Sequence, residues 1–188
     1  MHQFPRDSGW IEVICGSMFA GKTHELIRRL RLATLARQKV QVFKHKLDAR
    51  YAREDLVSHD QLRVPSVPVR RAKDILERIR VGTQVVGIDE AHFFDGKIVA
   101  VSQTLADRGL RVIVAGLDQD FRLKPFEPMA KLMAIAESVT KNLAICVVCG
   151  GPAGRSQRVT GGRQRIDVGH ADKYEARCRR CFRPDRAR

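Results

Sequence analysis

The spacing of apolar residues alternates along the chain between short runs typical of strands and the wider spacing typical of helices. Residues 10–15 form a β-prone run, and 23–38 carries apolar residues that include Leu26 and Leu30. Apolar residues spaced three or four apart face one side of a helix. The first two elements are therefore predicted to be a strand and a helix, joined by a tight loop that begins at Gly16.

The same alternation continues as far as residue 145. It predicts strands at 39–44, 83–88, 110–116 and 140–145, and helices at 72–81, 94–108 and 127–136. The stretch 45–69 is polar, charged and interrupted by Pro65 and Pro68, so we expect most of it to run over the surface. Alternating strands and helices favour an α/β fold, in which helices cover a parallel sheet.

The loop after the first strand has the sequence of a phosphate-binding loop. The motif G-x-x-x-x-G-K-[ST] is matched by Gly16-Ser17-Met18-Phe19-Ala20-Gly21-Lys22-Thr23. Its glycines let backbone N–H groups and the helix N-terminus face a polyphosphate. The Lys22 ammonium would neutralise phosphate charge, and the Thr23 hydroxyl would bind Mg²⁺. The motif therefore predicts nucleotide binding, but not the reaction.

Two carboxylates, Asp89 and Glu90, follow the strand predicted at 83–88. At the carboxyl end of a parallel strand they would lie beside the phosphate loop, where open α/β sheets bind ligands. Asp89 would contact Mg²⁺, directly or through water, and Glu90 could take a proton from a nucleophile. Asp89-Glu90-Ala91-His92 also spells the sequence box of a helicase family. A helicase needs two tandem α/β domains, however, and the core of this chain is long enough for only one.

The last quarter of the chain differs in composition from the rest. Residues 141–188 contain 12 Lys and Arg against 4 Asp and Glu, together with four of the five cysteines. These cysteines form two Cys-x2-Cys pairs separated by 28 residues: Cys146 with Cys149, and Cys178 with Cys181. The doubled spacing is typical of one closed, structural zinc site. We therefore expect an α/β core over 1–140 and a zinc-binding domain over 141–188.

The whole chain carries a formal charge of +14, from 35 Lys and Arg against 21 Asp and Glu. A surplus of this size favours anionic partners such as nucleotides, nucleic acids or acidic lipids. No apolar run approaches the ~20 residues that span a bilayer, and residues 1–10 have no hydrophobic signal-peptide core. We therefore expect a cytoplasmic protein without a membrane partner, in which paired cysteines bind metal.

Together these motifs resemble the thymidine kinase family shared by animals, as the cytosolic enzyme, and many bacteria. The resemblance runs from about Gly9 to Phe182. It rests on the phosphate loop and on sequences at 25–29, 48–51, 58–60, 87–94, 115–118, 124–126 and 169–174. It implies transfer of the γ-phosphate of ATP to the 5′-hydroxyl of thymidine, a homotetramer, and no nucleic-acid partner. It also implies that the segment between the cysteine pairs closes over the nucleoside as a lasso.

The resemblance assigns a role to individual residues. Glu90 matches the general base, and Lys22, Thr23 and Asp89 match the phosphate and magnesium contacts. The residues implied on the ATP side are Gly16, Ser17, Met18, Phe19, Ala20, Gly21, Lys22, Thr23, Asp89, Glu90, Ala91 and His92. Those implied on the thymidine side are Met18, Phe93, Leu117, Phe121, Ser156 and Tyr174. Asp48, Arg50 and Arg158 match polar residues on the phosphate-facing side.

Three positions depart from the family pattern. His92 stands where relatives often have Gln, and Gln61 and His170 stand where glycine is common. His92 is either a residue of the ATP side or a structural histidine at the surface. Without the resemblance, Phe93 and Phe121 would be assigned to the core. The alternative function is a P-loop ATPase or helicase-like module acting on nucleic acid, and a zinc-stabilised basic adaptor has less support.

Overall fold

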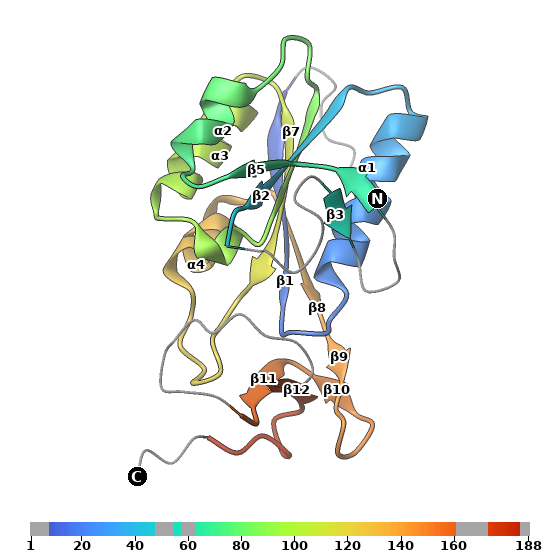
Figure 1. The fold of residues 1–188 in the computed structure, drawn as a ribbon, viewed down its shortest axis with the longest axis vertical. Helices are drawn as coiled ribbons and strands as arrows, with labels where there is room; N and C mark the ends of the chain where they lie inside the picture. The colour runs from blue at the N-terminus through green and yellow to red at the C-terminus, as the bar shows by residue number, and fades with distance from the viewer. Residues whose placement is uncertain (1–7, 48–54, 58–62, 161–172, 185–188) are drawn as a thin grey trace.

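In the computed structural model, six strands form one sheet in the order β5-β2-β6-β7-β1-β8, and all neighbours in it are parallel (Figure 1). The structure describes residues 8–47, 55–57, 63–160 and 173–184. The strands of this sheet are β1 (Trp10–Gly16), β2 (Val40–His45), β5 (Val67–Val69), β6 (Val85–Asp89), β7 (Arg111–Leu117) and β8 (Ser138–Asn142). The predicted α/β class is confirmed.

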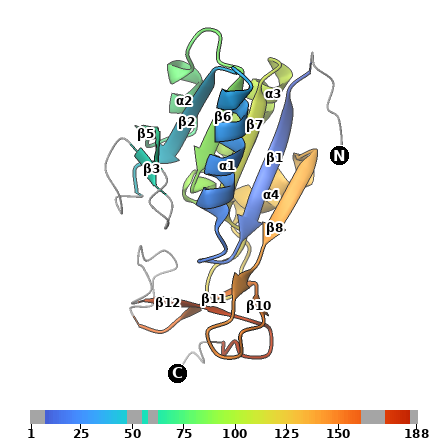
Figure 2. The same ribbon diagram turned by 90° about the vertical axis from the view of Figure 1, so that its right-hand side faces the viewer.

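Helices cover both faces of the sheet (Figures 1 and 2). One face is covered by α1 (Lys22–Leu35), and the other by α2 (Lys73–Arg78), α3 (Lys97–Asp107) and α4 (Glu127–Ile135). The side chains of β1 alternate accordingly, because Ile14 packs with Leu26 of α1 whereas Val13 packs in the opposite core. Strands buried on both faces need apolar residues at consecutive positions, which explains the short apolar runs of the sequence.

No helix among the described residues has both the length and the apolar composition that spanning a membrane requires.

The stretch 45–69 contains strands that the sequence pattern did not predict. β3 (Asp55–Val57) pairs antiparallel with β4 (Arg63–Pro65), and β5 joins the main sheet beside β2. Pro68 lies within β5, where it is tolerated because β5 is an edge strand and one side of it needs no N–H donor. The prediction of a surface excursion is therefore wrong for β5.

Several other elements have different ends from those predicted. The helix predicted at 94–108 begins only at Lys97, after the 3-10 turn η1 (Ala91–Phe93). The strand predicted at 140–145 is two strands, β8 in the main sheet and β9 (Ala144–Ile145) beyond it. β9 pairs with β10 (Pro152–Ala153), and β11 (Arg155–Arg158) pairs with β12 (Tyr174–Arg177). These four short strands form a small module at one end of the sheet, at the bottom of Figure 1.

A buried carboxylate on β1 joins α1 to the sheet. Glu12 is 6% exposed and accepts hydrogen bonds from Trp10 Nε1 at 2.8 Å, Arg29 at 2.8 Å and Arg111 at 2.6 Å. Arg29 also donates to Thr140 of β8 at 2.9 Å. Burial raises the pKa of Glu12, but the hydrogen bonds from Arg111 and Trp10 and the two arginine charges outweigh it, so the pKa lies below its usual value. This network fixes α1, and with it the loop that precedes α1.

We predict that Glu12→Gln lowers the free energy of unfolding at pH 7 by about 2 kcal/mol, because two partly buried guanidinium groups lose their counter-charge. The folded-state pKa of Glu12 lies below the ordinary value of 4.5, so the stabilisation is complete above that pH and is lost as the pH falls through the lowered pKa. Urea unfolding across this range should therefore show the difference between the two proteins shrinking below pH 4.5. A difference that stays constant down to pH 3 would contradict the role given to the ionised carboxylate.

Candidate functional site

The phosphate loop turns sharply between β1 and α1. At Gly16 the backbone φ is 138°, and a Cβ there would lie 2.3 Å from the carbonyl oxygen of Asn142, so only glycine fits. Gly21 precedes α1 in the left-handed region, with φ 69°. The Lys22 ammonium donates to the carbonyl oxygen of Ser17 at 2.7 Å and so lies across the loop. A loop of this shape, leading into a helix of 14 residues, can bind an anion such as phosphate at its N–H groups.

Thr23 and Asp89, which are 66 positions apart in the sequence, meet beside this loop. Thr23 Oγ1 donates a hydrogen bond to Asp89 Oδ2 at 3.1 Å. Asp89 is the last residue of β6 and is 3% exposed. A hydroxyl and a carboxylate are oxygen ligands of the kind that Mg²⁺ accepts. The fold therefore brings together the two residues that were predicted on the magnesium side.

Glu90 and His92 form a strained turn after β6. Glu90 has φ 52° and ψ 41°, a left-handed conformation that costs a non-glycine residue about 1 kcal/mol. His92 Nδ1 accepts the Leu117 N–H at 3.1 Å and lies 3.4 Å from Glu90 Oε2. In a neutral ring that accepts at Nδ1, the proton is on Nε2. At 4% exposed, His92 is not the surface histidine that was one of its two predicted alternatives.

Aromatic rings and a guanidinium group form a buried cluster where the loop after β7 meets the small module. Phe121 is 4% exposed and Tyr174 is 6% exposed. The guanidinium carbon of Arg158 lies 3.7 Å from the centre of the Phe121 ring, and its Nη2 donates to the Tyr174 hydroxyl at 2.6 Å. Such cation–π contacts are strongest when the cation is shielded from water. Arg158, predicted on the phosphate-facing side, here lies among residues predicted on the thymidine side.

The small module docks directly on the phosphate loop. The Met18 N–H donates to Ser156 Oγ of β11 at 3.0 Å, and Ser17 Oγ donates to the Ala153 carbonyl oxygen of β10 at 3.3 Å. Ala20 of the loop shares a small apolar core with Cys146, Ala153 and other residues of the module. The loop is therefore held by the module as well as by the sheet and α1.

Four cysteine sulfurs gather in the same module. The Sγ atoms of Cys146, Cys149, Cys178 and Cys181 all lie within 4.8 Å of one another, and those of Cys149 and Cys178 are 3.7 Å apart. A tetrahedral zinc site with Zn–S bonds of 2.3 Å separates its sulfurs by about 3.8 Å. The Cys181 N–H points at the sulfur of Cys178 and lowers the pKa of Cys178, which favours the thiolate that binds metal. The four residues fit a metal ion such as zinc.

Comparison with known proteins identifies the family. The sequence model of the family described as thymidine kinase matches residues 9–182. The chain belongs to the thymidine kinase family. It is 59% identical over 178 residues to the thymidine kinase of Rhodothermus sp. strain ITI 518, an alignment that covers 95% of this chain and 83% of that protein. It is 56% identical over 177 residues to the thymidine kinase of Bdellovibrio bacteriovorus, covering 94% and 87% respectively. The resemblance inferred from the motifs is confirmed.

Some residues of the thymidine kinase motifs lie outside the part of the chain that the structure describes. They include Asp48 and Arg50, predicted on the phosphate-facing side, and Gln61 and His170, which depart from the family pattern. Their predicted roles stay predictions.

Sequence reasoning missed several residues in the loop that follows β7. Asp120 is 3% exposed, and its Oδ1 accepts the N–H groups of Arg122 and Lys124 at 2.9 Å each, which shapes the loop around Phe121. Gln119 Nε2 donates to the Gly154 carbonyl oxygen of the small module at 2.8 Å. An Asp that can bond to N–H groups just after it is a recognisable turn signal, whereas nothing in the sequence marks Gln119.

We predict that stripping the metal with a strong chelator loosens the phosphate loop. Without the metal, β10 and β11 should become less ordered. The hydrogen bond of the Met18 N–H to Ser156 and the packing of Ala20 against the module should then be lost. Amide hydrogen exchange in residues 16–21 should therefore become about tenfold faster, as measured by mass spectrometry. Exchange in β6, a central strand of the main sheet, is the internal control. An unchanged rate in the loop together with faster exchange in β11 would show that the loop does not depend on the module.

Proposed function

We propose that this chain is a thymidine kinase, which transfers the γ-phosphate of ATP to the 5′-hydroxyl of thymidine. The observation that carries the proposal is the hydrogen bond between Thr23, which ends the phosphate-loop motif, and Asp89, which Glu90 follows, in a chain that belongs to the thymidine kinase family. The proposal is supported by the position of the loop and of Asp89 after the carboxyl ends of β1 and β6, since the carboxyl ends of the strands are the usual ligand site of open parallel sheets.

In this proposal the phosphate loop and the two acidic residues Asp89 and Glu90 have separate tasks. The loop N–H groups and Lys22 hold the β- and γ-phosphates of ATP, and Thr23 and Asp89 would hold Mg²⁺, which would neutralise phosphate charge when bound. The 5′-oxygen of thymidine forms a bond to the γ-phosphorus as the bond to the ADP oxygen breaks. Glu90 accepts the hydroxyl proton, and most of the acceleration comes from holding the reactants in line.

The nucleoside would lie against apolar and aromatic side chains. The wall is assigned to residues that the fold takes from separate segments of the chain: Met18, Phe93, Leu117, Phe121, Ser156 and Tyr174. A flat pyrimidine suits such walls, and backbone groups of the lasso could bond to its edge. The Ser156 hydroxyl accepts the Met18 N–H and keeps its own proton for donation to a ligand.

The proposal extends to the domains of the chain, its metal, its oligomeric state and its location. We assign the ATP-binding core to 1–140 and the lasso domain to 141–188, although β8 extends the core sheet to Asn142. Zinc is the metal that four thiolates at this spacing favour. A homotetramer is proposed from family resemblance. A cytoplasmic location suits an ATP-consuming enzyme whose cysteines must stay reduced.

The direct test is incubation of the protein with ATP, Mg²⁺ and thymidine. We expect thymidine monophosphate, detected by chromatography, in amounts equal to the ADP formed. ATP hydrolysis that single-stranded DNA stimulates, without phosphorylation of the nucleoside, would instead support the rival P-loop ATPase. Lys22→Ala should abolish product formation, because the phosphates lose their main cationic contact.

Glu90→Gln tests the base. The substitution keeps the volume of the side chain but removes its ability to take a proton, so we expect kcat to fall by about 10²- to 10⁴-fold. The affinity for ATP, measured by calorimetry, should change less than about twofold. Glu127→Gln, on the exposed start of α4, is the matched control and should keep full activity. Normal turnover in Glu90→Gln would exclude Glu90 as the base.

A further inference from the structure

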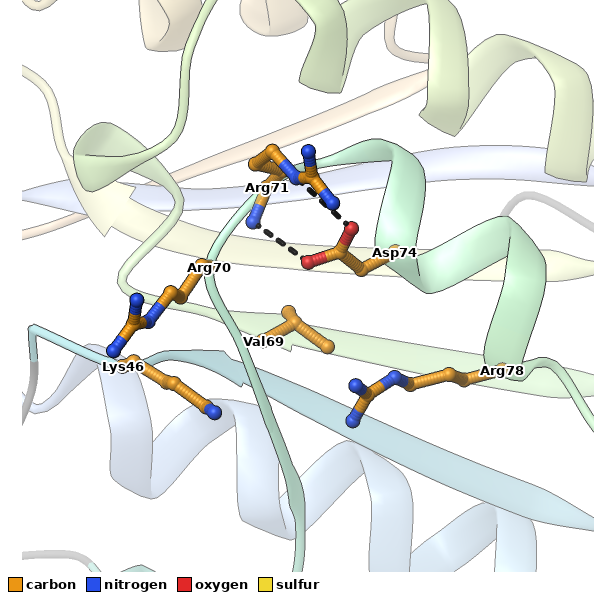
Figure 3. Close-up of a pocket in the computed structure, with 6 residues that line it drawn as sticks. All are labelled: Lys46, Val69, Arg70, Arg71, Asp74 and Arg78. Carbon is orange, nitrogen blue, oxygen red and sulfur yellow. Dashed lines mark hydrogen bonds and ion pairs between the residues drawn. The ribbon is translucent and has the colours of Figure 1, made fainter.

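A group of cationic side chains lines a hollow at the β5 edge of the sheet. The hollow has a volume of about 470 Å³ and is lined by Lys46, Val69, Arg70, Arg71, Asp74 and Arg78 (Figure 3). Lys46 follows β2, Arg70 and Arg71 follow β5, and Asp74 and Arg78 belong to α2. None of these residues has a part in the phosphoryl transfer proposed above.

Among the described residues, the positive charge around this hollow is only partly compensated. Arg71 pairs with Asp74, with 3.3 Å between Nε and Oδ1. Within the described parts of the chain, Lys46, Arg70 and Arg78 have no ion-pair partner. Figure 3 shows the side chains of Lys46 and Arg78 pointing toward one another from opposite sides of Val69. Like charges that face one space repel each other, so an anion between them is stabilised by all of them at once.

Hydrogen bonds fix the backbone that carries these cations. The Lys46 N–H donates to the carbonyl oxygen of the last residue of β5 at 2.9 Å, and the carbonyl oxygen of Arg70 bonds to the His45 ring at 2.9 Å. Gln41 Nε2 donates to the carbonyl oxygen of Arg78 at 2.8 Å. Only the side chains have to become ordered when a ligand binds, which limits the entropic cost of binding.

We propose that the hollow binds a small anion that carries several phosphate groups, either the polyphosphate chain of a nucleotide or an inorganic polyphosphate. Its volume falls within the range of about 300–1,000 Å³ that small-molecule sites occupy. Arginine forks bind phosphate oxygens in pairs, and three arginines line this space. A nucleic-acid backbone would instead need cations along an extended stripe, whereas these converge on one hollow.

The test is a titration of the full chain, labelled at Val and Ala methyl groups, with inorganic tripolyphosphate under nuclear magnetic resonance. The Val69 methyl groups report on the hollow, and the Ala20 methyl group reports separately on the phosphate loop. We expect the Val69 signals to shift and saturate. In Arg70→Gln combined with Arg78→Gln, the Kd from Val69 should rise about tenfold or more, while the Kd from Ala20 stays the same.

The matched control is Arg31→Gln combined with Arg108→Gln, which removes the same charge from exposed positions on α1 and after α3. It should leave the Val69 titration within about twofold. Lys46→Gln, on the opposite side of the hollow from Arg78, should also raise the Kd measured at Val69, as the double variant Arg70→Gln with Arg78→Gln (the pocket variant) does. Val69 signals that do not saturate, or a control that weakens binding as much as the pocket variant, would overturn the proposal.

A parallel titration with ATP separates the two sources of phosphate. Tighter binding of ATP than of tripolyphosphate at Val69 assigns the hollow to nucleotides, and equal or weaker binding assigns it to inorganic polyphosphate. Because Ala20 is followed in the same spectra, failure of the proposed ATP site would be seen at Ala20 and would leave the result at Val69 unaffected.

Discussion

The hydrogen bond between the Met18 N–H and Ser156 Oγ joins the phosphate loop to the small module, together with the bond from Ser17 to Ala153 and the packing of Ala20. A loop N–H that is already bonded to β11 is not available to a phosphate, so the proposed ATP site uses other N–H groups of the loop. Ser156 in turn faces Ala176 in the pairing of β11 with β12, and β12 leads directly into Cys178. The cysteine cluster is thus connected to the phosphate loop through β12 and β11.

The turn at Glu90 combines a strained backbone with tight packing of the residues that follow it. Left-handed Glu90 would relax if the 3-10 turn after it could move. That turn is fixed because the His92 ring packs 4.2 Å from the ring of Phe93 and 4.9 Å from that of Phe126, and because it accepts the N–H of Leu117. Glu90, which follows β6, is therefore positioned through His92 by Leu117 at the end of β7 and by Phe126 before α4.

The sequence predicted what depends on neighbouring residues and missed what depends on distant segments meeting. Three short patterns could be recognised because the spacing within each follows from the chemistry of the ligand that it is predicted to bind. They are the phosphate loop, the pair Asp89 and Glu90, and the Cys-x2-Cys pairs. Gln119 bonds to Gly154, and Ser17 to Ala153, only because the small module folds back onto the sheet, and no local pattern encodes that contact. β5 was missed for a related reason, since Pro68 signals a loop unless the strand is known to lie at an edge.

The net charge of +14 is informative only once each cation is placed. Arg29 and Arg111 neutralise the buried Glu12, and Arg158 lies on the Phe121 ring, so these three stabilise the fold. Lys22 lies across the phosphate loop, where it balances the charge of a bound nucleotide in the proposed reaction. Cations of both kinds contribute equally to a charge count that suggests nucleic acid. Their positions distinguish structural charge from charge that is left to bind a ligand.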